Sequence, residues 1–197
     1  MKTSGTLIAA FGRQYEVRTD AGEILLCVPR GKKSLFACGD RVKVAVTGPG
    51  QGVIDKLEER SSLLYRSDAW RQKLIAANAT QVVLVVATEP SFSDEFLSRC
   101  LCAAESQHLK TLIVLNKADI SAGLENSRAL LAPFAALGYP ILELSALGDV
   151  DALRERLVGE TSLLVGQSGM GKSTLTNALI PEARAQTREI SEVLDTG

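Results

Sequence analysis

The sequence has few of the residues that build metal sites and disulfide frameworks. Its 197 residues include one histidine and four cysteines, and no CxxC pair occurs. His108 alone gives too few ligands of the usual kind for a structural zinc site, and its place after an apolar helical stripe predicts a helix C-terminus instead. The scattered cysteines are typical of a reducing compartment, so we expect a cytoplasmic protein.

Long apolar runs are also missing. No run approaches the length of about 18 residues that a membrane-spanning helix needs, and residues 1–4 lead directly into a predicted strand. We therefore expect neither a membrane span nor a signal peptide. The composition, 46% hydrophobic and 23% charged, indicates a soluble globular protein large enough for two modest cores.

The net charge is small but unevenly distributed. Residues 1–73 carry 13 Lys and Arg against 8 Asp and Glu, a net of +5, while residues 74–197 carry 9 against 15, a net of −6. The overall pI of 5.9 would by itself argue against a nucleic-acid partner. The asymmetry instead indicates a basic module joined to an acidic, nucleotide-handling domain.

A phosphate-binding loop (P-loop) lies near the end of the chain, between a predicted strand over residues 161–165 and a predicted helix over 172–179. Its glycines leave room for backbone N–H donors to surround a triphosphate at a helix N-terminus. We expect Lys172 to meet the β- and γ-phosphates, Ser173 to bind Mg²⁺ and Thr174 to contact the α-phosphate, with Lys172 and Ser173 as the catalytic residues. The alternative is a plain glycine-rich turn. The loop residues are Gly166, Gln167, Ser168, Gly169, Met170, Gly171, Lys172 and Ser173.

An NKxD motif follows the predicted strand over residues 111–115 and consists of Asn116, Lys117, Ala118 and Asp119. A carboxylate at Asp119 would accept two hydrogen bonds from the N1–H and N2–H₂ groups of guanine, an edge that adenine lacks. Asn116 would hold the loop, and the stem of Lys117 would cover one face of the base. Alone, such residues are also common as turn and N-cap residues after strands.

The order of the two motifs is informative because it is reversed. In an ordinary GTPase the P-loop opens the domain, whereas here it begins 50 residues after Asn116. Between the two motifs, Ser145 and Ala146 follow a third predicted strand over residues 141–144 and match a loop whose backbone N–H meets guanine O6. The alternative for this pair is the N-cap of a helix over residues 151–158.

The basic part of the chain predicts a small antiparallel barrel. Strand-like segments separated by Gly-, Pro- and Asp-containing turns favour an OB-fold; they are residues 6–17, 24–28, 41–46 and 52–57. Arg30, Lys32 and Lys33 form a basic loop that could grip RNA phosphates, although surface loops commonly carry such residues for solubility and a base-stacking platform is not obvious. Residues 61–80 are interpreted as a linker and lead-in.

These motifs resemble the circularly permuted GTPases, and among them the family of ribosome small-subunit-dependent GTPases that assist late maturation of the bacterial 30S subunit. The resemblance covers the whole chain, and residues 189–194 are similar to the segment before the family's first switch. It implies an OB-fold over residues 1–60, a circularly permuted GTPase domain with a parallel sheet wrapped on both faces over residues 81–197, Mg²⁺ with GTP or GDP, and a 30S and 16S rRNA partner. It also implies zinc only in a C-terminal domain that this chain lacks.

The resemblance implies a GTP-hydrolysing assembly factor, and we expect a monomer. Neither the Thr-rich switch nor a DxxG motif follows Ser173, so we expect the chain to be part of a longer protein, to bind GDP, to hydrolyse GTP poorly and to leave the P-loop strand near an exposed edge. A nucleotide-gated RNA-binding module without efficient hydrolysis is the alternative. A P-loop kinase is a third possibility, which the NKxD motif disfavours.

For the helix expected to end at His108, Ser91 and Asp94 predict a capping box at its start.

Overall fold

The structure is a computed structural model that describes residues 2–31, 36–67 and 72–180. The chain divides into two units, residues 1–79 and residues 80–197. Lys32, Lys33 and the segment 189–194, which the sequence analysis singled out, lie outside the described residues.

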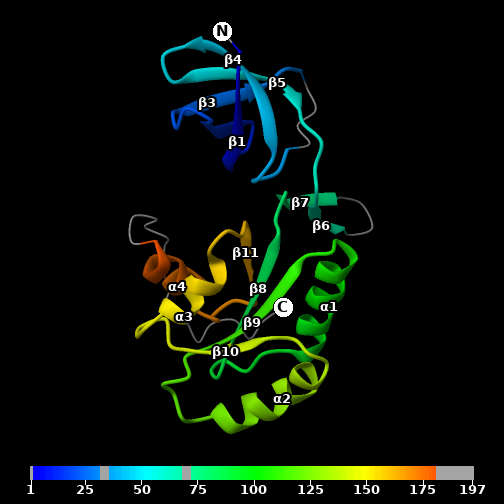
Figure 1. Ribbon diagram of the computed structural model, residues 1–197, viewed down its shortest axis with the longest axis vertical. Helices are drawn as coiled ribbons and strands as arrows, with labels where there is room; N and C mark the ends of the chain where they lie inside the picture. The colour runs from blue at the N-terminus through cyan, green and yellow to red at the C-terminus, as the bar shows by residue number, and fades with distance from the viewer. Residues whose placement is uncertain (1, 32–35, 68–71, 181–197) are drawn as a thin grey trace, which may run out of the picture. The chain divides into compact units, whose positions relative to one another are not determined.

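The first unit contains a closed five-stranded barrel whose strands alternate buried and exposed residues (Figure 1). Neighbouring strands are antiparallel except for one parallel pair, and the order around the barrel is β1-β2-β3-β5-β4. The core is built from the inward side chains Leu7, Tyr15, Val17, Leu25, Cys27, Val42, Val44 and Ile54. The strands are β1 (Lys2–Phe11), β2 (Gln14–Thr19), β3 (Ile24–Pro29), β4 (Arg41–Gly48) and β5 (Gln51–Leu57).

This barrel confirms the OB-like expectation and corrects one of its strands. The segment 6–17, predicted as one strand, is a hairpin of β1 and β2. Gly12 adopts a positive φ of 63° at the turn, a conformation that a residue without Cβ reaches at no steric cost. The apolar alternation resumes on the second strand, which is why the turn was missed.

The segment after the barrel holds a second hairpin, β6 (Leu63–Ser67) and β7 (Gln72–Ala77). A buried ion pair lies just before it: the carboxylate of Asp40 is fully buried and accepts from Arg60 Nε at 2.7 Å. This contact raises the pKa of Arg60. Asn78 adds a bond from Nδ2 to the carbonyl of Gly39 at 3.0 Å. Within residues 61–80, interpreted as a linker and lead-in from the sequence, Asn78 therefore bonds to the segment just before β4 of the barrel.

The second unit is an α/β domain around a parallel sheet with the order β10-β9-β8-β11. In Figure 1, α1 lies on one side of these strands and α3 and α4 lie on the other. Strand β8 is buried along its whole length, whereas β11 is only half-buried and pairs with β8 alone among the described strands. The elements are β8 (Gln81–Ala87), α1 (Asp94–Ser106), β9 (Lys110–Asn116), α2 (Leu124–Ala136), β10 (Ile141–Glu143), α3 (Asp151–Leu157), β11 (Ser162–Val165) and α4 (Lys172–Leu179).

The ends of α1 differ in part from the prediction. The predicted capping box at Ser91 and Asp94 is wrong, because Ser93 is the N-cap and its hydroxyl accepts from the N–H of Phe96 at 3.2 Å. At the other end His108 has a φ of 53°. Its N–H bonds to Glu105 O and that of Leu109 to Ala104 O, the pattern of a Schellman motif. His108 thus closes the helix through its backbone.

Candidate guanine-nucleotide site

The P-loop connects β11 to α4, the strand-to-helix context that a phosphate site requires. Gly166 passes so close to β8 that a Cβ would collide with the carbonyl of Val85. Gly171 has a φ of 83°, and a Cβ there would collide with Nδ2 of Asn116. Met170 between them is 1% exposed. Gly169 also has a positive φ, of 79°, so the loop's shape depends on glycine at three positions and on one buried apolar anchor.

Lys172 lies at the start of α4 and turns back onto the loop. Its Nζ donates to the carbonyls of Gly166 and Gln167, each at 2.7 Å. Burial lowers the pKa of this amine, because desolvation disfavours its charged form. An anion in the loop would stabilise the charged form of the amine. Ser173 and Thr174 follow in the first turn of the helix and are half-buried.

Asn116 joins three segments that are far apart in the sequence. Its side chain is buried, with Nδ2 donating to the carbonyl of Met170 at 2.9 Å and Oδ1 accepting from the N–H of Ala146 at 2.9 Å. One amide thus bonds to the P-loop through Met170 and to the Ser145–Ala146 loop through Ala146. A buried amide with both ends paired has one stable orientation, so it fixes the distance between these loops.

The rest of the NKxD loop is held mainly through its backbone and Lys117. Lys117 has a φ of 59°, its Nζ donates to the carbonyl of Glu89 at 2.7 Å, and its own carbonyl accepts from Thr88 Oγ1 at 3.0 Å. The N–H of Ala118 bonds to Leu144 O at 3.1 Å. Asp119 is exposed, and among the residues that the structure describes none pairs with its carboxylate.

The Ser145–Ala146 loop lies beside the NKxD loop, as the motif order suggested, but its N–H groups are engaged. The N–H of Ala146 bonds to Asn116, and Ser145 Oγ accepts from the N–H of Leu147 at 3.3 Å. Ser145 does not cap α3, whose N-cap is Val150. Contact of this loop with guanine O6 stays a prediction.

Three residues around the site were missed from the sequence. Thr88, Glu89 and Ser93 belong to the loop between β8 and α1, and each bonds to a residue of a nucleotide motif. The sequence did contain one indication that this loop belongs to the site. The loop follows the carboxyl end of a central strand, where open α/β sheets bind ligands. It carries no motif of its own, so nothing in the sequence assigned it a partner.

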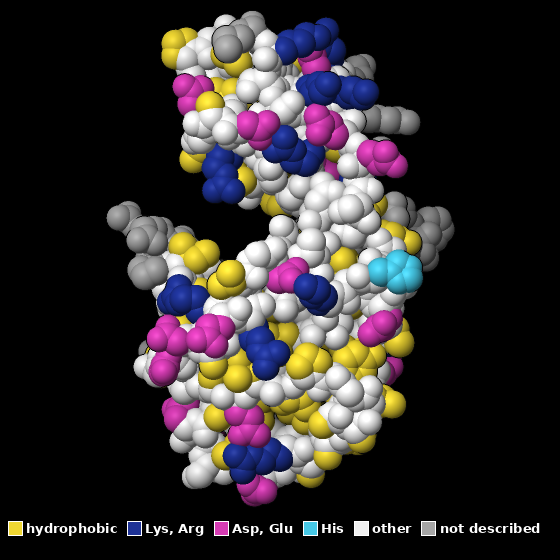
Figure 2. All heavy atoms as spheres, in the orientation of Figure 1, with side chains coloured by type: hydrophobic (Ala, Val, Ile, Leu, Met, Phe, Trp, Pro, Cys, Tyr) yellow, Lys and Arg dark blue, Asp and Glu magenta, His cyan; other side chains and the backbone are white. Residues whose placement is uncertain are grey.

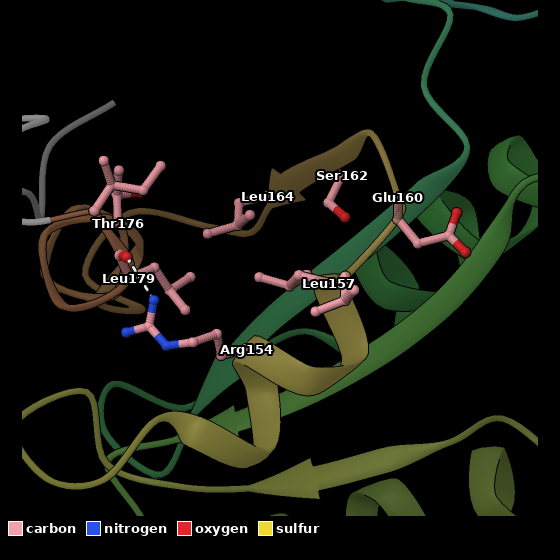
Figure 3. Close-up of a pocket in the computed structure, with 9 residues that line it drawn as sticks. Arg154, Leu157, Glu160, Ser162, Leu164, Thr176 and Leu179 are labelled. Carbon is pink, nitrogen blue, oxygen red and sulfur yellow. Dashed lines mark hydrogen bonds between the residues drawn. The ribbon is translucent and has the colours of Figure 1, made fainter.

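A pocket of about 380 Å³ lies away from these motifs, between α3, β11 and α4 (Figure 3). Leu157, Leu164 and Leu179 give it an apolar lining, and Arg154 Nη1 donates to the carbonyl of Leu179 at 3.0 Å. The pocket lies beside the edge strand and contains none of the predicted site residues. Within the described ranges, no helix is long and apolar enough to cross a membrane, and no three His, Cys, Asp or Glu residues cluster as metal ligands would.

The parallel sheet, the P-loop and an NKxD loop that comes before the P-loop in the sequence define a circularly permuted P-loop GTPase domain. In the sequence this domain follows an OB-like barrel. Residues 57–197 match the family model described as RsgA GTPase, so the chain belongs to the RsgA GTPase family. The resemblance inferred from the sequence is thereby confirmed.

Individual relatives agree with the family. The chain is 52% identical over 201 residues to a small ribosomal subunit biogenesis GTPase RsgA of Burkholderia pseudomallei (strain K96243), covering 100% of this chain and 64% of the relative. The small ribosomal subunit biogenesis GTPase RsgA of Ralstonia pickettii (strain 12J) is 51% identical to this chain, over 98% of this chain and 62% of the relative's own length. The chain therefore spans somewhat less than two thirds of these relatives.

Solved structures show the same fold. The crystal structure of YjeQ from Thermotoga maritima superposes with a TM-score of 0.72 at 33% identity, covering 92% of this chain and 66% of that one. YloQ, described as a circularly permuted GTPase, gives a TM-score of 0.65 at 26% identity over 93% of this chain and 66% of its own. These matches span both the barrel and the α/β domain.

Proposed function

We propose that the protein binds guanine nucleotides at the loops joined by Asn116 and hydrolyses GTP to GDP and phosphate as a maturation factor of the small (30S) ribosomal subunit. The observation that supports this proposal most directly is the pair of 2.9 Å hydrogen bonds that join the Asn116 amide to Met170 and Ala146. They bring together the three loops that we propose to read the base and hold the phosphates, despite their permuted order. The function in the names of the relatives supports the biological assignment.

Each half of the site has a group ready for its part of the ligand. The carboxylate of Asp119 is exposed and can accept the paired N–H donors of guanine. Among the described residues, the ammonium of Lys172 bonds only to the backbone carbonyls of Gly166 and Gln167, which it can exchange for β- and γ-phosphate oxygens. Such an exchange replaces neutral acceptors by negatively charged ones, which attract the ammonium more strongly at the same distance.

The residues also fit a magnesium ion that accompanies the nucleotide. The hydroxyl of Ser173 lies in the first turn of α4, directly after Lys172, and among the described residues it has no hydrogen-bond partner. It is therefore available as an oxygen ligand. Together with phosphate oxygens it would hold Mg²⁺, which neutralises charge on the phosphates during transfer to water.

Guanine selectivity tests the nucleotide assignment. Isothermal calorimetry should show GDP binding far more tightly than ADP, because a site that leaves a carboxylate unpaired rejects the wrong base by several kcal/mol, as an order of magnitude. Asp119→Asn exchanges an acceptor for a donor and should shift preference toward xanthosine diphosphate. Equal affinity for GDP and ADP in the unmodified protein would remove the base-reading assignment of residues 116–119.

For the ribosome-facing part of the function, we propose that the barrel contacts 16S rRNA through phosphates. Figure 2 shows Lys and Arg side chains on the visible face of this unit, with acidic side chains among them. Arg30 is paired with Asp55 at 2.7 Å, and Lys2 reaches the same carboxylate at 3.3 Å. In contrast, Lys43 and Lys56 lie directly opposite each other on β4 and β5, both exposed, and neither has an acidic partner among the described residues.

A like-charged cross-strand pair is unfavourable by itself, so Lys43 and Lys56 join Arg30, Lys32 and Lys33 as proposed phosphate-binding residues. Removing one such residue should flatten the log-log salt dependence of 30S binding by about 0.7 to 0.9. Lys43→Ala with Lys56→Ala should therefore flatten it by about twice that value, whereas unchanged slopes would make this face an ordinary solvated surface. We further propose a monomer that acts in the cytoplasm, and a zinc site only in a domain outside this chain.

A further inference from the structure

The loop between β8 and α1, residues 88–93, contacts both halves of the candidate site without belonging to any of its motifs. At its start, Thr88 Oγ1 donates to the carbonyl of Lys117 at 3.0 Å, and Glu89 O accepts from Lys117 Nζ at 2.7 Å. At its end, the N–H of Ser93 donates to Oε1 of Gln167 in the P-loop at 3.0 Å. The same six residues thus hold the base-reading loop and the phosphate loop.

Gln167 makes this link with its side chain while its backbone serves the P-loop. Its carbonyl accepts from Lys172 at 2.7 Å, and its side-chain oxygen bonds to a backbone N–H 74 positions earlier in the chain. Ser93 also has two separate roles. Its hydroxyl caps α1 through Phe96, and its N–H is left for Gln167. The two roles can therefore be separated by substitution.

The two loops differ in how much support the sheet gives them. The base-reading loop follows β9, which has β8 on one side and β10 on the other, whereas the P-loop follows β11, which pairs only with β8 in the part of the chain described. The P-loop therefore depends more on side-chain hydrogen bonds. Two of them come from distant segments, from Asn116 to Met170 and between Ser93 and Gln167.

We propose that Gln167 is a positioning residue of the nucleotide site, which fixes the start of the P-loop to the β8–α1 loop through the Ser93 N–H and so sets its distance from Lys117. This inference rests on the proposed nucleotide-binding function. A nucleoside diphosphate spans both loops, and any freedom between them in the unbound protein must be lost on binding, at a cost in affinity. The bond from Ser93 to Gln167 removes part of that freedom beforehand.

The first test compares Gln167→Leu with the unmodified protein. Leucine has a similar size and no acceptor, so it removes the bond without leaving a large hole. One hydrogen bond contributes about 1 kcal/mol, which corresponds to about fivefold in affinity. Calorimetry should therefore show GDP binding about fivefold more weakly to the variant. Wild-type affinity for GDP in Gln167→Leu would overturn the proposal.

Two substitutions at Ser93 provide a matched pair. Ser93→Ala and Ser93→Pro both lose the hydroxyl that caps α1, but only proline also loses the N–H. The backbone at Ser93, with φ −89° and ψ 122°, is extended as proline requires, with φ about 10° beyond the usual range of proline. We expect thermal unfolding to show the loss of the cap in both variants. Only Ser93→Pro should weaken GDP binding, again by about fivefold, and equal affinity of the two variants would contradict the inference.

The double variant identifies the partner of Gln167. If Gln167 acts through the Ser93 N–H, then adding Gln167→Leu to Ser93→Pro should cause no further loss of GDP affinity, because the bond is already absent. Losses that multiply would show that the two residues act independently, which contradicts the proposal. Failure of the proposed nucleotide-binding function would give a different result from failure of this inference. The unmodified protein would then show no preference for GDP over ADP.

Discussion

The base-reading loop and the P-loop are built on strands of very different character. The first follows β9, an interior strand whose last five residues are buried, and it begins with the buried Asn116. The second follows β11, a half-buried strand at the edge of the described sheet. The sheet thus fixes the base side of the site, while the phosphate side relies on glycine geometry and on side-chain hydrogen bonds that join it to distant segments.

The two sides also differ in whether the group proposed to bind the nucleotide already has hydrogen-bond partners. On the base side the group proposed to read guanine, the carboxylate of Asp119, is exposed and has no partner in the described residues. On the phosphate side Lys172 is already bonded to the loop's carbonyls. Binding should therefore rearrange the phosphate side more than the base side. Substitutions on each side test this difference, and the largest effect is expected at the residue that the two sides share.

Removing that shared residue should loosen both sides at once. Asn116→Ala leaves the carbonyl of Met170 and the N–H of Ala146 without their bonds, and each buried group left unpaired costs about 1–3 kcal/mol. The unbound protein can recover part of this cost by letting the loops loosen and hydrate, which nucleotide binding must then reverse. We expect calorimetry to show a loss of GDP affinity of about a hundredfold, with about 1.4 kcal/mol for each factor of ten.

Asn116→Asp is the matched control for this anchor. It keeps the acceptor for Ala146 but replaces the donor to Met170 by a carboxylate oxygen. The P-loop should therefore lose its bond to this side chain while the Ser145–Ala146 loop keeps its own. Hydrogen exchange should show faster exchange at residues 166–171 than at 145–148, and equal effects at both loops would argue against the separate support described above.

Truncating the lysine should affect the phosphate side alone. Lys172→Ala removes the charge proposed to meet the β- and γ-phosphates, so GDP affinity should fall by about tenfold and GTP hydrolysis should be lost. Burial lowers the pKa of this amine, which means that its charge is disfavoured where it lies. The nucleotide-free variant should accordingly unfold at a temperature no lower than the unmodified protein. Retained GTP turnover would show that the P-loop is not the active site.

The sequence predicted the elements of this site better than their contacts. Helix α4 begins and ends where the periodicity placed it, at Lys172 and Leu179, because a glycine precedes it and the apolar stripe is continuous. The barrel was predicted with one strand too few, since the alternation of residues 6–17 continues across the turn at Gly12. Local patterns of this kind report on the nearest residues in the chain.

Contacts between distant segments left no such local pattern. Nothing around Gln167 distinguishes a side chain that bonds to Ser93 from one that faces solvent. The pairing of Arg30 with Asp55 joins the residue just after β3 to β5, two segments that the sequence could not align. The role of Asn116 was partly foreseen as holding its own loop. Its bonds to two other loops depend on the order of strands in the sheet, which the structure supplies.

A substitution at Lys117 should have only a small effect if the base side is held by the sheet. Lys117→Met keeps most of the stem proposed to cover the base but loses the bond from Nζ to Glu89 O. Because β9 still fixes the loop, we expect GDP affinity to fall by only about twofold. This is less than the loss of about fivefold that corresponds to one hydrogen bond. A loss as large as that of Lys172→Ala would mean that the base-reading loop also depends on side-chain contacts.

The smallest effect on binding is expected at the far end of the P-loop helix. Arg154 donates to the carbonyls of Leu179 at 3.0 Å and Ala178 at 3.4 Å, two groups that have no partner within the helix because they lie in the last turn of α4. Arg154→Met retains the apolar stem in the pocket and removes these bonds and the favourable charge at the helix end, a change of about 0.3–1 kcal/mol. Thermal unfolding should detect a slightly lower midpoint, while calorimetry should give an unchanged GDP affinity because the P-loop lies at the opposite end of the helix. If Arg154→Met also weakened GDP binding, support of the phosphate side would extend through the whole of α4, and the bonds at Met170 and Gln167 would no longer suffice to explain it.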